Sequence, residues 1–484
     1  MKKFFNLSQA DLLYFLILLV LVVLTQFYSI TDEVIDWDES TFMIMANDFY
    51  KGNLPYENLW DLKPPLFFIF LGSFYKIFGV SLLTTRLFGD LLIFLSSIVI
   101  YFISNKFLNK HLSLLSSTIY IFLVSFNFAQ PTLTEFLATL FLLLAILLNY
   151  STLNTNYFLI GFFLSLSIFT RTNMAIVVIY FLIKYIKKNV GFNKLLQFFL
   201  GGILPFLSLS LIYSFNGKLK EFIYSTFYMP FEYTFIRRSP IDVFLDSYVG
   251  IFFDNYLTIP TVVVILFFLF LLMLTINKSI YLNFLSLYKN YESLFNIFFL
   301  VTISIILTGR FYYHYLIQMF PFIAIFISIF INTLPRFKLQ ISCLLIVFFS
   351  ILTIPNFNES IKNINNYEEI SKNYPVKSFV KFINKEKTLL AIENHIIYFY
   401  LDVDPITPVV HPNVIMKIEQ NNTLLTSLEN LKYIRENEFE KLLNNFPDYI
   451  FCQNECESYF DSNYLNNYYL VHQLEDYKLY KINN

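Results

Sequence analysis

The chain has 484 residues, of which 56% are hydrophobic and only 14% are charged, and its net charge is −1. Soluble globular proteins carry about 25% charged residues, so the composition excludes that class and indicates a polytopic membrane protein. A net charge near zero excludes a basic field that would recruit nucleic acid. Three cysteines are too few for a disulfide framework.

The hydrophobic runs predict eleven membrane-spanning helices, because each approaches the length that the hydrocarbon core of a bilayer requires. The first follows the basic start "MKKFF", has no small-residue cleavage pattern after it, and therefore reads as a retained span. The runs lie near residues 12–30, 82–104, 112–130, 136–150, 156–170, 173–187, 195–215, 258–275, 294–308, 315–334 and 338–354.

A twelfth apolar run, residues 64–79, begins with proline, ends with glycine and contains Lys76. We expect an interfacial helix here, because cytoplasmic loops collect Lys and Arg. If this run crossed the membrane, all but Lys2 and Lys3 of the basic residues on the inner side would face outward. Those basic residues are Lys2, Lys3, Lys106, Lys110, Lys184, Lys187, Lys188, Lys194, Lys278, Lys289, Arg336 and Lys338.

This topology divides the chain into a membrane domain, residues 1–354, and an outer domain, residues 355–484. The outer face also receives the loops at 31–81, 131–135, 171–172, 216–257 and 309–314. After residue 355 the composition shifts to Asn, Lys, Glu and Tyr, with strand-like runs "TLLAI", "IIYFY", "DYIFCQ" and "YKLYKI". We therefore predict a small soluble α/β domain. Cys452 and Cys456 could pair in an oxidising compartment, and the sequence leaves this open.

Three carboxylates, Asp36, Asp38 and Glu39, follow the first span in "DWDESTFMIMANDFYKG". One interpretation is an amphipathic helix on the membrane surface, with Asp38 as its N-cap and Gly52 as its stop. The other makes Asp38 a general base that takes a proton from an attacking hydroxyl. The spacing alone does not decide between them.

Lys63 stands before two prolines in "LWDLKPPLFF", two residues after Asp61. Proline disfavours a helix at the preceding residue, so Lys63 is expected on an extended turn at the bilayer surface. Such a lysine either reaches to the lipid headgroups or binds the phosphate of a membrane-anchored ligand. Both interpretations stay open.

Four further charged or titratable residues fall on the same predicted face. Glu135 begins a span, where an acid also favours the helix dipole, and Arg171 interrupts two apolar runs, where a cation needs a partner. Arg310 and His314 are four residues apart, on one face if helical. Together with the carboxylates and Lys63, they suggest a pocket for an anionic lipid headgroup with proton chemistry beside it.

Short motifs in a fixed order give the chain a family resemblance. They are "DE" after the first span, "GNLPY" at 52–56, "KPPL" at 63–66, "FG" at 78–79, "TTRL" at 84–87, "TE" at 134–135, "TR" at 170–171 and "GRFYYHYLIQMFP" at 309–321. The chain thereby resembles membrane glycosyltransferases of the C superfamily. The most similar branch comprises protein O-mannosyltransferases, bacterial aminoarabinose transferases and their bacterial relatives.

The resemblance implies an inverting transfer of a sugar from a polyprenyl-phosphate donor to a hydroxyl of a glycan, lipid or protein. The active site would face the periplasm at the bacterial cytoplasmic membrane. Asp38, with Glu39 beside it, would be the catalytic candidate. Lys63 would bind the donor phosphate, and Arg171 and Arg310 would contact the donor phosphate or the acceptor.

Asp36, Asp61, Glu135 and His314 would line the substrate pocket. The family often has Glu directly before Lys-Pro-Pro, where this chain has Leu62, and this weakens any role for Asp61. The acidic cluster could hold a divalent metal, but no spacing demands one.

Two other classes of function stay open from the sequence. One is a flippase or transporter, whose ionisable groups line a path through the bilayer. The other is a non-catalytic scaffold whose C-terminal domain binds a partner in the cell envelope. The clustering of ionisable residues toward one face favours chemistry at the membrane surface.

Overall fold

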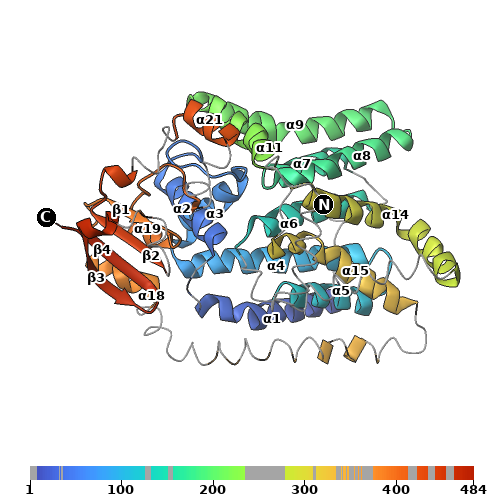
Figure 1. The fold of residues 1–484 in the computed structure, drawn as a ribbon. Helices are drawn as coiled ribbons and strands as arrows, with labels where there is room; N and C mark the ends of the chain where they lie inside the picture. Colours follow the sequence, from blue (N-terminus) through green and yellow to red (C-terminus); the bar gives the residue numbers. More distant parts are fainter. Residues whose placement is uncertain are drawn as a thin grey trace. The chain divides into compact units, whose positions relative to one another are not determined.

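The structure is a computed structural model, mostly helical, with a small sheet near the C-terminus (Figure 1). It describes residues 8–31, 33, 36–125, 132–150, 156–234, 278–308, 312–333, 374–412, 422–433, 442–453, 460 and 463–483, with isolated positions between 340 and 361. The chain divides into two compact units. The first unit comprises residues 1–28, 89–209 and 234–359, and the second comprises residues 29–88, 210–233 and 360–484.

Helices cover the predicted spans within the described part of the chain. They are α1 (Gln9–Thr31), α4 (Leu82–Ser104), α5 (Lys110–Leu123), α6 (Thr134–Asn149), α7 (Tyr157–Ile168), α8 (Ala175–Lys187), α9 (Phe192–Phe215), α14 (Lys278–Ile306) and α15 (Phe320–Asn332). Three of them, at Gln9–Ile30, Leu82–Ser104 and Phe192–Phe215, are long and apolar enough to cross a membrane. The expected run at 258–275 lies outside the described residues, as does most of the run at 338–354. The count of eleven therefore stays a prediction.

In the first unit, α7 and α9 cross at glycines. A Cβ atom on Gly161 would collide with the backbone of Phe198, and one on Gly201 would collide with the backbone of Phe158. Small residues let two helix backbones approach closely, which is a common way for helices to pack where lipid removes the hydrophobic drive between them.

In the second unit, α2 (Trp37–Lys51) packs against α3 (Leu66–Phe78). The expected helix at 64–79 is present, and its 13 residues are fewer than a membrane crossing needs. One of the two interpretations of the segment after the first span is an amphipathic helix on the membrane surface, and its exposure is wrong although the helix is present. Residues 39–48 of α2 are all buried, because α19 (Ile396–Leu401) also packs on α2.

The C-terminal sheet has the strand order β1-β2-β4-β3. Its strands are β1 (Leu389–Ala391), β2 (Tyr449–Gln453), β3 (Tyr468–Leu474) and β4 (Tyr477–Ile482). The β1–β2 pair is parallel, whereas β4 is antiparallel to both β2 and β3. One face buries a core that includes Leu390, Ile450 and Cys452. Cys452 is disulfide-bonded, and Cys456 lies outside the described residues.

Three of the four strand-like runs are strands in the structure, but "IIYFY" forms helix α19. Its buried residues Ile396, Ile397 and Leu401 follow a helical spacing, and the Tyr398 hydroxyl donates to the carbonyl of Leu389 on β1 at 2.8 Å. Packing against β1 and α2 therefore overrides the strand propensity of this β-branched and aromatic segment.

Replacing Gly72 on α3 should loosen the helix pair that carries the carboxylate cluster. A Cβ atom there would lie 2.6 Å from the carbonyl oxygen of Ala46 and 2.7 Å from the ring of Phe49. We expect Gly72→Ala to destabilise the protein by roughly 1–3 kcal/mol through overpacking. Gly191→Ala is the matched control, because nothing lies within 4 Å of its Cβ position. Equal melting temperatures for the two detergent-solubilised variants would contradict this packing.

Candidate active site

The start of α2 determines where Asp38 points. The N-cap of α2 is Asp36, whose carboxylate accepts from the backbone N–H of Glu39 at 3.0 Å. The expectation that Asp38 caps this helix is therefore wrong by two residues, and Asp38 lies inside the first turn. The predicted stop is confirmed, since Gly52 has φ +113° and its N–H bonds to Asp48 and Phe49 carbonyls. A left-handed residue at this position is the usual end of a helix.

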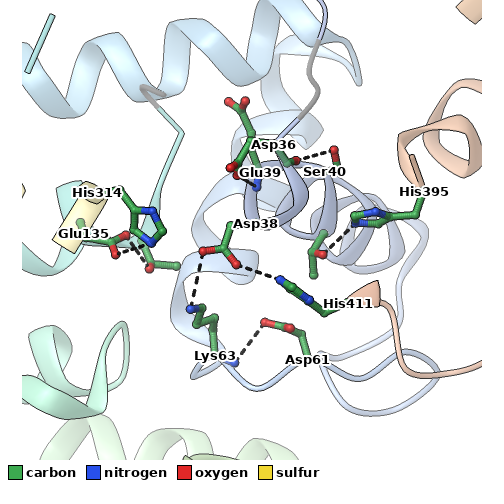
Figure 2. A network of polar contacts seen from close by, with 12 residues as sticks. Asp36, Asp38, Glu39, Ser40, Asp61, Lys63, Glu135, His314, His395 and His411 are labelled. Atoms are coloured by element: carbon green, nitrogen blue, oxygen red, sulfur yellow. Dashed lines mark hydrogen bonds and ion pairs between the residues drawn. The ribbon is translucent and has the colours of Figure 1, made fainter. Parts of the chain in front are cut away.

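Lys63 lies on a turn that is fixed on both sides of its backbone. Its N–H donates to the Asp61 carboxylate at 3.1 Å, and its carbonyl accepts from the Tyr56 hydroxyl at 2.5 Å. The Lys63 ammonium lies 3.8 Å from the Asp38 carboxylate, and Figure 2 shows the two side chains pointing toward one another. The side chains of Lys63 and Asp38 keep 18% and 15% of their surface exposed. Both charged groups therefore remain accessible to a ligand.

A short backbone pairing brings a histidine from the C-terminal segment to the same carboxylate. Trp60 forms a parallel bridge with Val409, with hydrogen bonds from the Trp60 N–H to Pro408 and from the Val410 N–H to Trp60. His411 follows this bridge, and its Nε2 lies 3.1 Å from the second oxygen of Asp38 (Figure 2). Asp38 thus lies between Lys63 and His411, with one oxygen toward each.

Burial and nearby charges have opposite effects on the pKa of the Asp61 carboxylate. Burial raises the pKa of Asp61, and the charges of His411 and Lys63 oppose that rise. His395 is buried beside α2, where its Nε2 lies 2.9 Å from the Thr41 hydroxyl. Burial lowers the pKa of His395 to about 3, so its ring is neutral at physiological pH. The site therefore combines Lys63, whose ammonium is accessible, with carboxylates that are buried to different extents.

Glu39 is directed away from Asp38 and has a partner of its own. It forms an ion pair of 2.6 Å with Arg86 of α4, and both side chains are 0% exposed. A buried charge is costly unless it is paired. This pair joins α2 to the start of α4, which gives Glu39 a structural role. Its predicted catalytic contribution stays a prediction.

Glu135, Arg171 and His314 contact one another within the first unit. The Arg171 guanidinium forms an ion pair with Glu135 and lies over the ring of Tyr315, 4.7 Å from its centroid. It also donates to the Thr134 hydroxyl at 3.1 Å, and His314 lies 3.6 Å from Glu135. The expected partner for the Arg171 cation is thus Glu135.

The predicted site residues therefore fall into two groups. Asp36, Asp38, Glu39, Asp61 and Lys63 come together in the second unit, and the cluster around Arg171 lies in the first unit. One pocket that contains both groups stays a prediction. Arg310 lies outside the described residues.

Sequence analysis did not assign roles to Arg86, His395 or His411. Arg86 had a usable signal, because a charge within an apolar helix predicts a buried partner. The two histidines had none, since the segment that carries them reaches α2 only through tertiary contacts. Across the described ranges, no three His, Cys, Asp or Glu side chains are arranged to hold a metal ion.

The fold is that of a helical membrane protein with a small C-terminal sheet, and it carries a site formed by an acid, a lysine and a histidine. Residues 62–213 match the family model for dolichyl-phosphate-mannose-protein mannosyltransferase. Among solved structures, the chain is similar to ArnT from Cupriavidus metallidurans bound to undecaprenyl phosphate. The TM-score is 0.63 at 12% sequence identity, over 98% of both chains.

The apo form of the same ArnT gives a TM-score of 0.57 at 11% identity, again over 98% of both chains. An oligosaccharyltransferase from Archaeoglobus fulgidus gives 0.46 at 11% identity, over 97% of this chain and 73% of that one. No curated protein sequence matches the chain. The fold is ArnT-like, and the resemblance to membrane glycosyltransferases of the C superfamily is confirmed.

Removing only the Arg86 charge of the Glu39–Arg86 pair should destabilise the protein more than removing both charges. Arg86→Met leaves the Glu39 carboxylate buried without its cation, which costs about 3–5 kcal/mol. We expect the double variant Glu39→Gln with Arg86→Met to recover most of that loss. Thermal unfolding of the purified variants measures both effects. A double variant at least as unstable as Arg86→Met would contradict the pairing as the source of stability.

Proposed function

We propose that the chain is an inverting glycosyltransferase that moves a sugar from a polyprenyl-phosphate donor to an acceptor hydroxyl. The family model that matches residues 62–213 is named for a lipid-phosphate sugar donor. The ArnT structure with the similar fold holds undecaprenyl phosphate. These likenesses support a lipid-phosphate donor for this chain, and its own residues support the chemistry.

The observation that carries the proposal is the contact between Asp38 and Lys63. A carboxylate suited to accept a proton lies 3.8 Å from a cation suited to bind phosphate, and both keep an exposed fraction. One sugar phosphate can therefore touch Lys63 while the acceptor hydroxyl approaches Asp38. The proposed reaction uses both the carboxylate and the cation, whereas helix capping uses only a carboxylate and lipid anchoring uses only a cation.

The proposed reaction balances as a single displacement. Asp38 takes the proton of the acceptor hydroxyl, and the acceptor oxygen forms a bond to the anomeric carbon. The bond from that carbon to the phosphate oxygen breaks, and its electron pair leaves with the polyprenyl phosphate. The phosphate gains one negative charge in this step. Lys63 therefore stabilises the transition state more than the ground state, which is the requirement for catalysis.

His411 and Asp61 position this pair rather than react. His411 contacts the oxygen of Asp38 that does not face Lys63, so it restrains the rotation of the carboxylate. Asp61 accepts the Lys63 backbone N–H and thereby sets the direction of the lysine. Arg86 neutralises Glu39, which leaves Asp38 as the carboxylate of the first turn of α2 that faces Lys63.

The proposed location is the outer face of the bacterial cytoplasmic membrane, with eleven spans and residues 355–484 in the periplasm. The three long segments that the charge pattern assigns to this face are residues 31–81, 216–257 and those after 355. Their described parts fall almost entirely in the second unit. This grouping supports a common side for the three segments, because loops on opposite faces of a bilayer could not pack into one compact unit.

The remaining predicted residues have more limited roles in the proposal. Arg171 is held by Glu135 and Tyr315, so a phosphate would have to compete with that ion pair. Arg310 is proposed as a second phosphate contact, and His314 as a polar residue of the substrate pocket. The acceptor is proposed to be a glycan, a lipid or a protein. No step requires a divalent metal.

Asp38→Asn should abolish transfer while the protein still folds. Asparagine keeps the shape of the side chain but cannot take a proton, and general-base assistance is worth about 10²–10⁴ in rate. The measurement is the release of free polyprenyl phosphate from a radiolabelled polyprenyl-phosphate sugar in membranes that contain the variant. Asp476→Asn, at an exposed position in the β3–β4 turn, is the control. Wild-type release by Asp38→Asn would reject Asp38 as the base, and no release by either protein would favour a flippase or a scaffold.

His411→Ala should lower kcat with little effect on the KM for the donor, since His411 orients the base and does not touch the phosphate. We expect a loss of about tenfold or more, because a hydrogen bond to a charged group is worth roughly 1.5–3 kcal/mol. The low-pH limb of the rate profile should move to higher pH, as the carboxylate loses a donor. His411→Gln retains a donor and should recover part of the rate. An unchanged pH profile in His411→Ala would contradict the positioning role.

A further inference from the structure

A cavity lies in the same unit as Asp38 and is not part of the site described above. It has a volume of about 630 Å³ and is formed by the end of α2, residues 80–83 and two segments of the C-terminal domain. This volume is within the range of small-molecule sites. All of its lining residues belong to the second unit.

Aromatic side chains form much of the cavity wall. They are Tyr50 at the end of α2, Tyr374, and the neighbouring Phe399 and Tyr400 of α19. Tyr50 is 44% exposed, so its ring is available to a ligand. Rings of this kind offer flat apolar faces, with hydroxyl groups at the rim for hydrogen bonds.

The polar side of the cavity is close to neutral and carries both donors and acceptors. Lys51 is paired with Asp402 at 2.9 Å and with Asp404 at 3.6 Å. Asn47 donates to the same Asp402 at 3.0 Å. Lys377 is the second lysine of the lining. An anion would require cations that no carboxylate already neutralises. Lys51 does not meet that condition, and Lys377 lies beside the Glu33 carboxylate, which accepts its backbone N–H.

The wall that carries Tyr374 and Lys377 is fastened to the segment that leaves the first span. The Glu33 carboxylate accepts the backbone N–H groups of Val376 and Lys377, each at 3.1 Å. Two hydrogen bonds to one carboxylate hold this wall in a fixed position before any ligand arrives. A preformed wall reduces the ordering cost of binding.

The cavity is also displaced from the proposed base. Asn47 and Lys51 follow Asp38 by nine and thirteen residues on the same helix, which at 1.5 Å per residue is about 14–20 Å. A ligand in the cavity therefore cannot present its own hydroxyl to Asp38 unless it is extended. The opposite edge includes Leu83, which is 41% exposed, and follows the exposed Ile77 and Phe78 of α3.

We propose that this cavity, which we call the Tyr50 pocket, binds a saccharide unit of the acceptor at a distance from the hydroxyl that reacts. Aromatic faces beside a neutral set of donors and acceptors match the C–H faces and hydroxyl groups of a sugar ring. This inference rests on the proposed glycosyltransferase function. It predicts an extended acceptor, whose remote binding energy helps to position the reactive end. The saccharide could be free, or it could be the headgroup of a glycolipid.

Binding without turnover tests the Tyr50 pocket. The probes are trisaccharides of glucose, galactose, mannose and N-acetylglucosamine, measured by saturation-transfer NMR with the full-length protein in nanodiscs. We expect at least one probe to bind the wild type and Asp38→Asn equally, and Tyr50→Ala about three- to tenfold more weakly. Tyr50→Phe should bind almost as well as wild type. Tyr469→Ala is the matched control, since Tyr469 is 47% exposed on β3, outside the cavity lining.

Two outcomes would overturn the proposal: no binding of any trisaccharide to the wild type, or equal binding to wild type and Tyr50→Ala. Nanodiscs with and without a monoglycosyl diacylglycerol distinguish the sources, because a glycolipid headgroup would displace the free sugar. Failure of the proposed catalytic role of Asp38 would give a different result. In that case the pocket would still bind sugar, but Asp38→Asn would release polyprenyl phosphate like the wild type.

Discussion

Two backbone hydrogen bonds between Trp60 and residues 408–410 determine much of the candidate site. They join the loop after the first span to a segment more than 340 residues later, and they place His411 against Asp38. The Trp60 indole N–H also donates to Ser225 at 2.8 Å, which ties a third distant segment to the same point. Without this pairing, Asp38 and Lys63 would form an isolated surface ion pair, which is worth little in water.

The three carboxylates at the start of α2 have different roles. Asp36 caps the helix, Glu39 is buried against Arg86, and Asp38 keeps access to a ligand. A helix turns about 100° per residue, so adjacent side chains face different surroundings. Among these three, the one suited to proton transfer is the one that retains exposure and has a cation beside it. Burial rather than residue type separates the roles.

The charged residues divide between stabilising the fold and binding a ligand. Glu39–Arg86 in the second unit and Glu135–Arg171 in the first are buried ion pairs, in which each partner offsets the cost of burying the other. Lys63 differs because its carboxylate contact is longer and more exposed. A phosphate can therefore bind Lys63 at a smaller cost in free energy than it can bind Arg171. The Tyr50 pocket adds ligand contacts farther along α2.

The sequence by itself determined the class of the protein, most of its helices, the stop of α2 at Gly52, and the candidate pair Asp38 and Lys63. The first three follow from hydrophobic run length, charge bias and proline or glycine chemistry, which act over a few residues, and the candidate pair follows from the family resemblance of short motifs. The tertiary structure decided the cap at Asp36, the partner Arg86, the helix at 396–401 and the arrival of His411. Each of these depends on contacts between segments far apart in the chain. No local pattern records such contacts, because the energy of burying a side chain depends on its neighbours in space.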